Sequence, residues 1–321
     1  MEQPYAKWQN AGFETSMNNE YTQIAGLLLE IAPHVFASGR FAMKGGTALN
    51  FFVHEMPRLS VDIDVVYVDH TIGREAALEE IGERLAAIQA KLERLGYEVR
   101  LISTKGGDEV KLLVSNGNSQ VKIEVNHVFR GSLLPVERAQ LTASARDYFK
   151  VDCSVPILAV PELYGGKLVA AMDRQHPRDL FDVLGMYRRF GLTDSIVECF
   201  VSYLAGHNRP IHEVLFSNDS DMSHAFDKEF SGMTNIAVSL AELEQTRGRL
   251  RKELPKALTD KHRRFLISLA DAEPKWDLMA CPHLEQLPAI RWKLLNLAKL
   301  KKTNPEKFHQ QSDEMRRRFD S

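Results

Sequence analysis

The chain has 321 residues, enough for two domains that each bury a core of their own. Its 44% hydrophobic and 26% charged residues are ordinary for a globular protein, and its apolar runs are too short to span a membrane. The three scattered cysteines form neither a disulfide framework nor a zinc pattern, and the polar start of the chain does not resemble a secretory signal, so we expect a cytoplasmic protein.

The charge is unevenly distributed along the chain. The formal net charge is −2, yet residues 247–321 carry a net +8 and the remainder carries −10. Helical spacing would place Arg247, Arg249, Arg251 and Lys252 on overlapping faces, and Trp276 and Trp292 lie in the same basic region. Such a region favours a polyanionic or acidic partner, although solvated helix faces would give the same composition.

The predicted elements change character near residue 160. In chain order we expect a helix over 21–36, a strand over 40–43, a helix over 47–55 capped by Thr47, a strand over 59–68 and a helix over 74–95. Strands follow over 97–103, 110–115, 120–128 and 155–160, with an Asn116-Gly117 hairpin turn. Beyond Pro161 the pattern is helical, apart from a loop over 207–227. This order predicts an α+β domain over residues 1–160 and a mainly helical domain over 161–321.

The most informative pattern is a pair of carboxylates that follows a glycine turn. Asp62 and Asp64 alternate on one predicted strand and therefore share a face, while Ile63 faces the opposite way. Two adjacent carboxylates repel each other unless a cation lies between them, and Mg²⁺ or Mn²⁺ prefers such oxygen ligands. The preceding Gly45-Gly46 turn lets backbone N–H groups approach a phosphate. Either motif alone is weak, but their order favours a metal-dependent nucleoside triphosphate (NTP) site.

A third carboxylate stands on the second strand of the predicted hairpin. Alternation over residues 121–126 places Lys122, Glu124 and Asn126 on one face. If this strand neighbours the Asp62 strand, Glu124 completes a trio that could hold two metal ions, or it acts as a base. An ordinary exposed hairpin face would show the same alternation.

The start of the helical part supplies further charged residues. Lys167 stands among small and apolar residues on a predicted helix, and it could face a cleft or the surface. Pro177 begins a new helix in which Arg178 and Asp182 are spaced i, i+4. That spacing is also typical of a simple stabilising ion pair.

Taken together, these motifs resemble the AbiEii/AbiGii toxin nucleotidyltransferases, a family of the DNA polymerase β-like nucleotidyltransferase superfamily. The resemblance covers roughly residues 25–190 and depends on motifs that occur in family order: Lys44-Gly45-Gly46-Thr47, Arg58-x-Ser60-x-Asp62-x-Asp64, Lys122-x-Glu124, Lys167-Leu168 and Arg178-Asp179-x-x-Asp182. Glu124 stands where the superfamily more commonly has Asp. Residues 193–321 carry no motif that we can match.

The resemblance implies roles for these positions and a function for the chain. Metal ligands would be Asp62, Asp64 and Glu124, and these three with Lys167 and Asp182 would be catalytic. The nucleotide would be bound by Lys44, Gly45, Gly46, Thr47, Arg58, Ser60 and Arg178. The family implies a toxin of a toxin–antitoxin or phage-defence system, with a cognate antitoxin as partner. Such toxins add nucleotides to the 3′ end of tRNA and so block translation.

Two other functions remain open from the residues alone. The same chemistry could serve a protein hydroxyl or a small molecule as acceptor. An inactive relative could act only as a binding partner, although the retention of Asp62, Asp64 and Lys167 argues against it. The sequence leaves the transferred nucleotide and the oligomeric state undetermined.

Overall fold

A computed structural model describes residues 17–103, 109–234 and 236–320. The start of the chain, for which we expected no secretory signal, lies outside the described residues. Two compact units emerge, one formed by residues up to Leu163 together with Phe230–Ala237, the other by Tyr164–Glu229 and residues from Val238 onward. The sequence did not indicate that residues 230–237 belong to the first unit. There Thr234 forms a β-bridge with Arg58.

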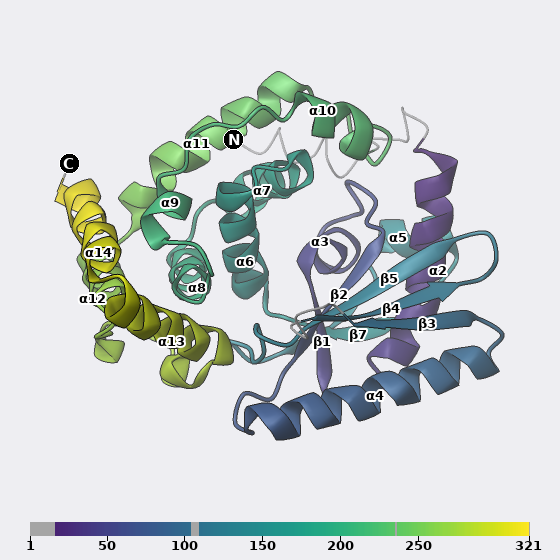
Figure 1. Ribbon diagram of the computed structural model, residues 1–321. Helices are drawn as coiled ribbons and strands as arrows, with labels where there is room; N and C mark the ends of the chain where they lie inside the picture. The colour runs from purple at the N-terminus through teal and green to yellow at the C-terminus, as the bar shows by residue number, and fades with distance from the viewer. Residues whose placement is uncertain (1–16, 104–108, 235, 321) are drawn as a thin grey trace. The chain divides into compact units, whose positions relative to one another are not determined.

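The first unit is built around a mixed sheet (Figure 1). Its elements are α2 (Asn19–Val35), β1 (Phe41–Lys44), α3 (Gly45–Ala48), the π-helical turn η1 (Leu49–Val53), β2 (Asp62–Tyr67), α4 (Arg74–Arg94), β3 (Glu98–Ser103), β4 (Glu109–Ser115), β5 (Gln120–Asn126), β6 (Glu137–Gln140), α5 (Ala143–Phe149) and β7 (Ser154–Ile157). Within the described residues the strand order is β3-β4-β5-β2-β1-β7-β6.

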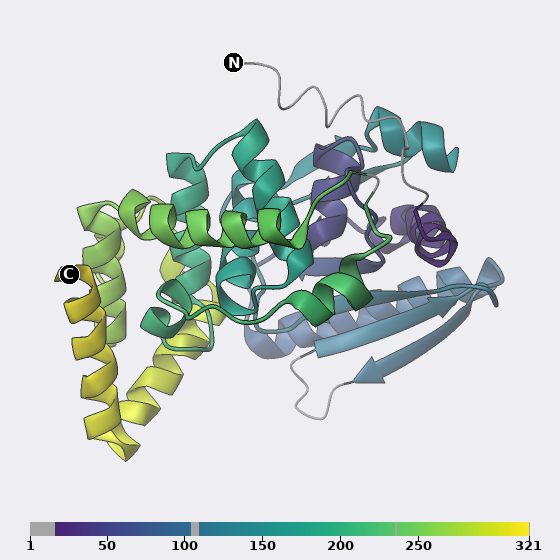
Figure 2. The ribbon, with the colours of Figure 1, turned by 90° about the horizontal axis from the view of Figure 1, so that it is seen from above.

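Along Asp62–Val65 of β2 and along β5, alternate residues belong to the hydrophobic core. Ile63 and Val65 on β2 and Ile123 and Val125 on β5 are fully buried, whereas the residues between them are partly exposed. Helix α2 contacts β2 and β5, and helix α4 contacts β3. Figures 1 and 2 show α4 running beneath β3 and β4. The alternation therefore leaves the opposite face of β2 and β5 available for polar side chains.

The second unit is helical among its described residues. Its elements are α6 (Val160–Asp173), which begins in the first unit, α7 (Pro177–Arg189), α8 (Asp194–Ala205), α9 (Ile211–Leu215), α10 (Ser223–Ala225), the π-helical turn η2 (Phe226–Phe230), α11 (Leu240–Ala257), α12 (Asp260–Ala270), the 3-10 turns η3 (Trp276–Leu278) and η4 (Leu284–Gln286), α13 (Pro288–Thr303) and α14 (Pro305–Asp320). No helix in the described part of the chain is long and apolar enough to cross a membrane.

The predicted α+β fold, with a mixed sheet followed by helices, is confirmed, and the errors are local. Strand β6 and helix α5 were not predicted, and the predicted 207–227 loop contains α9 and α10. The last strand ends at Ile157, because α6 begins at Val160. Thr47 does not cap a helix: Lys44 occupies the N-cap position, and Thr47 lies inside α3.

Candidate active site

Asp62 and Asp64 project from the polar, partly exposed face of β2. Strand β5 pairs with β2 in parallel, with Asp62 opposite Lys122 and Asp64 opposite Glu124. The prediction that the second hairpin strand neighbours the Asp62 strand is therefore confirmed. All four side chains belong to one face, because paired residues of adjacent strands point the same way.

The glycine turn lies against Asp64, on the side of β2 opposite β5. Strand β1 is antiparallel to β2, with Lys44 opposite Asp64, so the chain enters the turn beside this carboxylate. Gly45 has φ +74°, and a Cβ there would overlap the Asp64 carboxylate. At Gly46 a Cβ would lie 2.5 Å from Nη2 of Arg58. At both positions a Cβ would force a charged side chain to move, and at Gly45 the left-handed backbone favours glycine as well.

Buried polar residues fix the position of this turn. The Thr47 hydroxyl is hydrogen-bonded to the Asp62 carbonyl and lies 2.8 Å from the Ser60 hydroxyl. Arg58 is only 3% exposed, and its Nη1 donates to the Leu59 carbonyl at 2.8 Å. Thr47, Arg58 and Ser60 therefore hold the glycine turn against β2, an anchoring role that the sequence motif did not distinguish from contact with the nucleotide.

Glu124 is bound to two lysines on the same face of the sheet. Lys111 on β4 lies 2.6 Å from its Oε1 atom and Lys122 lies 3.2 Å from the same atom. Lys122 also lies 3.6 Å from Oδ1 of Asp62. Burial acts to raise the pKa of Glu124, but the two lysines outweigh it and leave that pKa below its ordinary value. Among the described residues no three His, Cys, Asp or Glu side chains cluster as a metal site, so the metal role of Glu124 stays a prediction.

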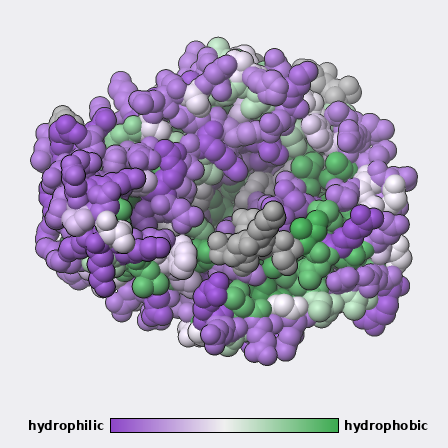
Figure 3. Space-filling model, in the orientation of Figure 1, coloured by the Kyte–Doolittle hydropathy of each residue, from purple (hydrophilic) through white to green (hydrophobic). Residues whose placement is uncertain are grey.

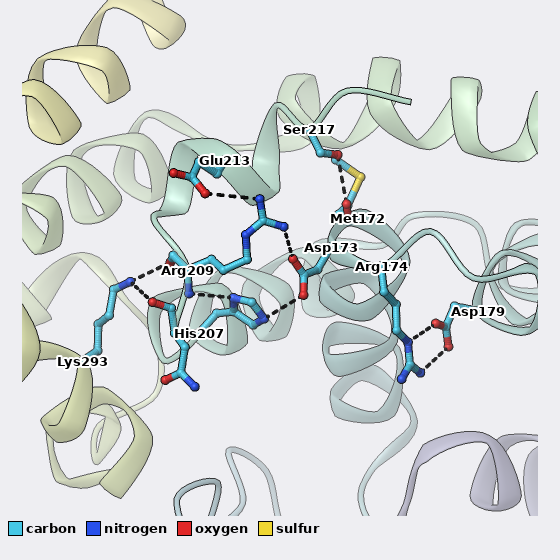
Figure 4. A network of polar contacts seen from close by, with 10 residues as sticks. Met172, Asp173, Arg174, Asp179, His207, Arg209, Glu213, Ser217 and Lys293 are labelled. Carbon is cyan, nitrogen blue, oxygen red and sulfur yellow. Dashed lines mark hydrogen bonds and ion pairs between the residues drawn. The ribbon is translucent and has the colours of Figure 1, made fainter. Parts of the chain in front are cut away.

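The second unit contains a buried cluster around Lys167. Its ammonium lies 3.0 Å from Oδ1 of Asp179 and 2.8 Å from Oδ2 of Asp182. Arg174, at the end of α6, also donates to both oxygens of Asp179 (Figure 4). Burial acts to raise the pKa of Asp179, but these two cations reverse the effect and hold that pKa far below its usual range.

Asp179 is the functional candidate that our predicted site residues omitted. It is 1% exposed and ties α6 to α7 through Lys167 and Arg174, whereas the sequence pattern points to Arg178 and Asp182 on α7. The spacing could have revealed it, because Asp179 and Asp182 stand i, i+3 on one helical face and both can reach a single ammonium. The backbone N–H of Arg178 donates to Nδ1 of His176, which caps α7.

Close packing of α6 places Lys167 inside the second unit. A Cβ at Gly165 would lie 2.6 Å from the Cβ of Cys199 and 2.8 Å from the backbone nitrogen of Phe200. Because Gly165 lacks that atom, α6 approaches α8 closely, and the neighbouring Lys167 is only 7% exposed. A buried ammonium requires charged partners, which Asp179 and Asp182 supply.

Comparison with known proteins decides the family. The model of a family described as "Nucleotidyl transferase AbiEii toxin, Type IV TA system" matches residues 27–294, which is most of the chain. The chain belongs to the AbiEii nucleotidyltransferase toxins. The predicted family is thereby confirmed. A comparison with curated proteins gave no match.

A solved structure supports the fold of this AbiEii protein. The present chain is similar to the solved structure of MenT4, a nucleotidyltransferase toxin from Mycobacterium tuberculosis H37Rv, with a TM-score of 0.58 and 19% sequence identity. The similarity covers 86% of this chain and 94% of MenT4. Nucleotidyltransferases use an NTP and a divalent metal, and a type IV toxin–antitoxin family implies an antitoxin partner.

Proposed function

We propose that this AbiEii toxin transfers a nucleotide from an NTP at the face formed by β2, β5 and the Gly45-Gly46 turn. The observation that carries the proposal is the contact between the turn and Asp64, because it places a phosphate-binding turn beside a carboxylate. In the reaction an acceptor hydroxyl loses its proton and bonds to the α-phosphorus, and pyrophosphate leaves.

The residues of the first unit fit a divalent cation. Asp62 and Asp64 offer hard oxygen ligands from one strand face, and the absence of a Cβ at Gly45 leaves room for the Asp64 carboxylate. These two would hold Mg²⁺, or Mn²⁺, which when bound neutralises triphosphate charge and activates the acceptor hydroxyl. Glu124, predicted as a third metal ligand, could bind the cation only after losing its contacts with Lys111 and Lys122.

Lys167, Asp182 and Arg178 are proposed to act in the same reaction. Support comes from their motif order and from the burial of Lys167, whose desolvated charge would interact strongly with a leaving pyrophosphate. Asp179 would then serve as a positioning residue, since it holds both Lys167 and Arg174.

We propose RNA as the acceptor, most specifically the 3′ end of tRNA, so that modification blocks translation in the cytoplasm. The supporting surface differs from the one we expected. Arg247 of α11 is 8% exposed and donates to Gln175 and to the Ser220 carbonyl, while Arg251 pairs with Asp219. The expectation of an exposed backbone-binding face at Arg247 is therefore wrong, because its guanidinium is buried among local acceptors and already pairs with Asp219.

Helix α13 presents exposed cations with no acidic residue on the same helix, whereas α11 mixes cations with glutamates. The exposed cations of α13 include Arg291, Lys299 and Lys302. Trp292 is 44% exposed and Leu295 is 64% exposed, while the surface over α12–α14 is otherwise mostly hydrophilic (Figure 3). Exposed cations beside an aromatic ring suit a phosphate backbone with stacked bases. The basic surface and the toxin family support RNA over a small molecule.

The test is to incubate the protein with total RNA, Mg²⁺ and each labelled NTP in turn. We expect label on the 3′ end of tRNA with one NTP, and inhibition of translation by the modified tRNA. Label in the protein fraction would favour a protein hydroxyl as acceptor, and label on a small molecule would favour a small-molecule acceptor. No transfer to any acceptor would favour an inactive binding relative. Protection of cells from phage that disappears in Asp62→Asn and Asp64→Asn would support a role in phage defence.

A further inference from the structure

Two lysines are built into the carboxylate face by strand register. Lys122 is paired with Asp62 across β2 and β5, and Lys111 is paired with Glu124 across β4 and β5. Register fixes the faces of side chains, so both ammonium groups share the surface of the carboxylates whatever rotamers they adopt. The lysines are therefore part of the site rather than neighbours at its edge.

Both lysines lie against the carboxylate of Glu124, whereas the glycine turn lies against that of Asp64. Oε1 of Glu124 lies 2.6 Å from Lys111 and 3.2 Å from Lys122. Lys122 extends between two carboxylates, since it also lies 3.6 Å from Asp62. The Lys122 ammonium therefore offsets the repulsion between Asp62 and Glu124, which a bridging metal ion would otherwise have to offset.

The charges of the cluster favour a single metal ion. Three carboxylates without the lysines would need two divalent cations to reach a small positive net charge. With Lys111 and Lys122 in place, one divalent cation gives the same net charge. A second divalent cation would be repelled by both ammonium groups at a distance of a few ångströms.

We propose that Glu124 holds Lys111 and Lys122 in place of a second metal ion, so that the site binds one divalent cation, at Asp62 and Asp64. The inference rests on the proposed function, because it concerns the metal of that site. The sheet order β5-β2-β1 places the lysines and the glycine turn on opposite sides of β2. The lysines therefore lie on the side of the site away from the phosphate-binding turn.

The test counts Mn²⁺ bound to the full chain by electron paramagnetic resonance. The protein is titrated with Mn²⁺ in the presence of an NTP analogue whose α,β-bridge is a non-hydrolysable methylene. We expect one protein-dependent Mn²⁺ in the parent and still one in Glu124→Gln. The double variant Lys111→Met with Lys122→Met should gain a second. The control Lys91→Met changes an exposed lysine of α4 and should bind as the parent does.

Three results would overturn the inference. Two Mn²⁺ ions in the parent that fall to one in Glu124→Gln would make Glu124 a metal ligand and would leave the proposed function intact. A double variant that folds, by circular dichroism, but still binds one ion would show that the lysines do not replace a metal. No bound Mn²⁺ in the parent would overturn the proposed metal dependence as well.

Discussion

At the scale of single residues, two separate features favour glycine at position 45, and comparing substitutions at Gly45 and Gly39 distinguishes them. The φ of +74° at Gly45 strains any other residue, and its missing Cβ leaves space for Asp64. Gly39 has φ +68° and no atom within 4 Å of a Cβ, so it shares the first feature only. The pair therefore isolates the contact with the carboxylate from the cost of the backbone conformation.

Gly45→Ala should lose more stability than Gly39→Ala. We expect about 1 kcal/mol for Gly39→Ala from backbone strain, and a further loss of about 1–2 kcal/mol for Gly45→Ala. Nucleotide transfer should fall only in Gly45→Ala, because Asp64 must move. Denaturant unfolding and an NTP transfer assay measure the two effects. Equal losses and equal activity would show that the turn does not depend on its contact with Asp64.

Removing Asp179 should lower the free energy of unfolding more than removing its partner Arg174. Its removal in Asp179→Ala leaves Lys167 buried with one carboxylate fewer, which should cost about 3 kcal/mol or more in the free energy of unfolding. Arg174 has a side chain that is 64% exposed, so Arg174→Ala should cost under about 1 kcal/mol. Denaturant unfolding of the two variants checks this order. A larger loss in Arg174→Ala would show that the exposed Arg174–Asp179 ion pair contributes more to stability than the buried contact with Lys167.

At the scale of elements, the sequence predicted what depends on local pattern. The alternation over 121–126 and the Asn-Gly turn identified β5, and the apolar spacing identified α2 and α4. Strand β6 was missed because Glu137–Gln140 is mostly polar and exposed, so no alternation marks it. The burial of Arg247 was missed because Gln175, Asp219 and Ser220, distant in sequence, meet it only in the fold.

Helix α13 should make stability depend on pH in the alkaline range. Lys293 is 6% exposed, and its ammonium donates to the backbone carbonyls of Asn208 and Arg209 (Figure 4). Burial lowers its pKa from 10.5 to about 8. Between these values the unfolded chain binds a proton that the folded chain has released, so stability should rise with pH.

The expected rise is about 1–2 kcal/mol between pH 8 and 9.5, at most 1.36 kcal/mol per pH unit. Lys293→Met removes the titrating group and should abolish this rise. Denaturant unfolding of both proteins across this range measures the difference. Parallel pH profiles for the parent and the variant would show that Lys293 keeps its ordinary pKa.

The exposed face of α13 should carry RNA affinity that α11 does not. Replacing Lys299 and Lys302 by Ala should weaken RNA binding and lower its log–log salt slope by about one unit per lost phosphate contact. NTP binding should be unchanged. Arg249→Ala is the control, because Arg249 already pairs with Glu253 at 3.0 Å. If the α13 variant binds RNA as the parent does at every salt concentration, this face is only a solvated surface.

At the scale of the whole molecule, the chain combines two units with separate chemistry. The first supplies the carboxylates, the glycine turn and the lysine pair, and the second supplies the Lys167 cluster and the basic helix α13. The carboxylate pair and the turn were predictable because both are short motifs of fixed spacing. Alternation also placed Lys122 beside Glu124, but Lys111 was missed, since it reaches Glu124 through the register of β4 on β5.

The central claim is that Asp62 and Asp64 form the catalytic centre. The most direct measurement is the rate of labelled nucleotide incorporation into RNA by Asp62→Asn and Asp64→Asn at saturating Mg²⁺ and NTP. The control is Asp147→Asn, which changes an exposed carboxylate on α5. We expect both site variants to fold and to lose at least about 100-fold in rate, since each removes a ligand of the catalytic cation, while the control keeps the parent rate. Incorporation at the parent rate by folded Asp62→Asn and Asp64→Asn would contradict the account.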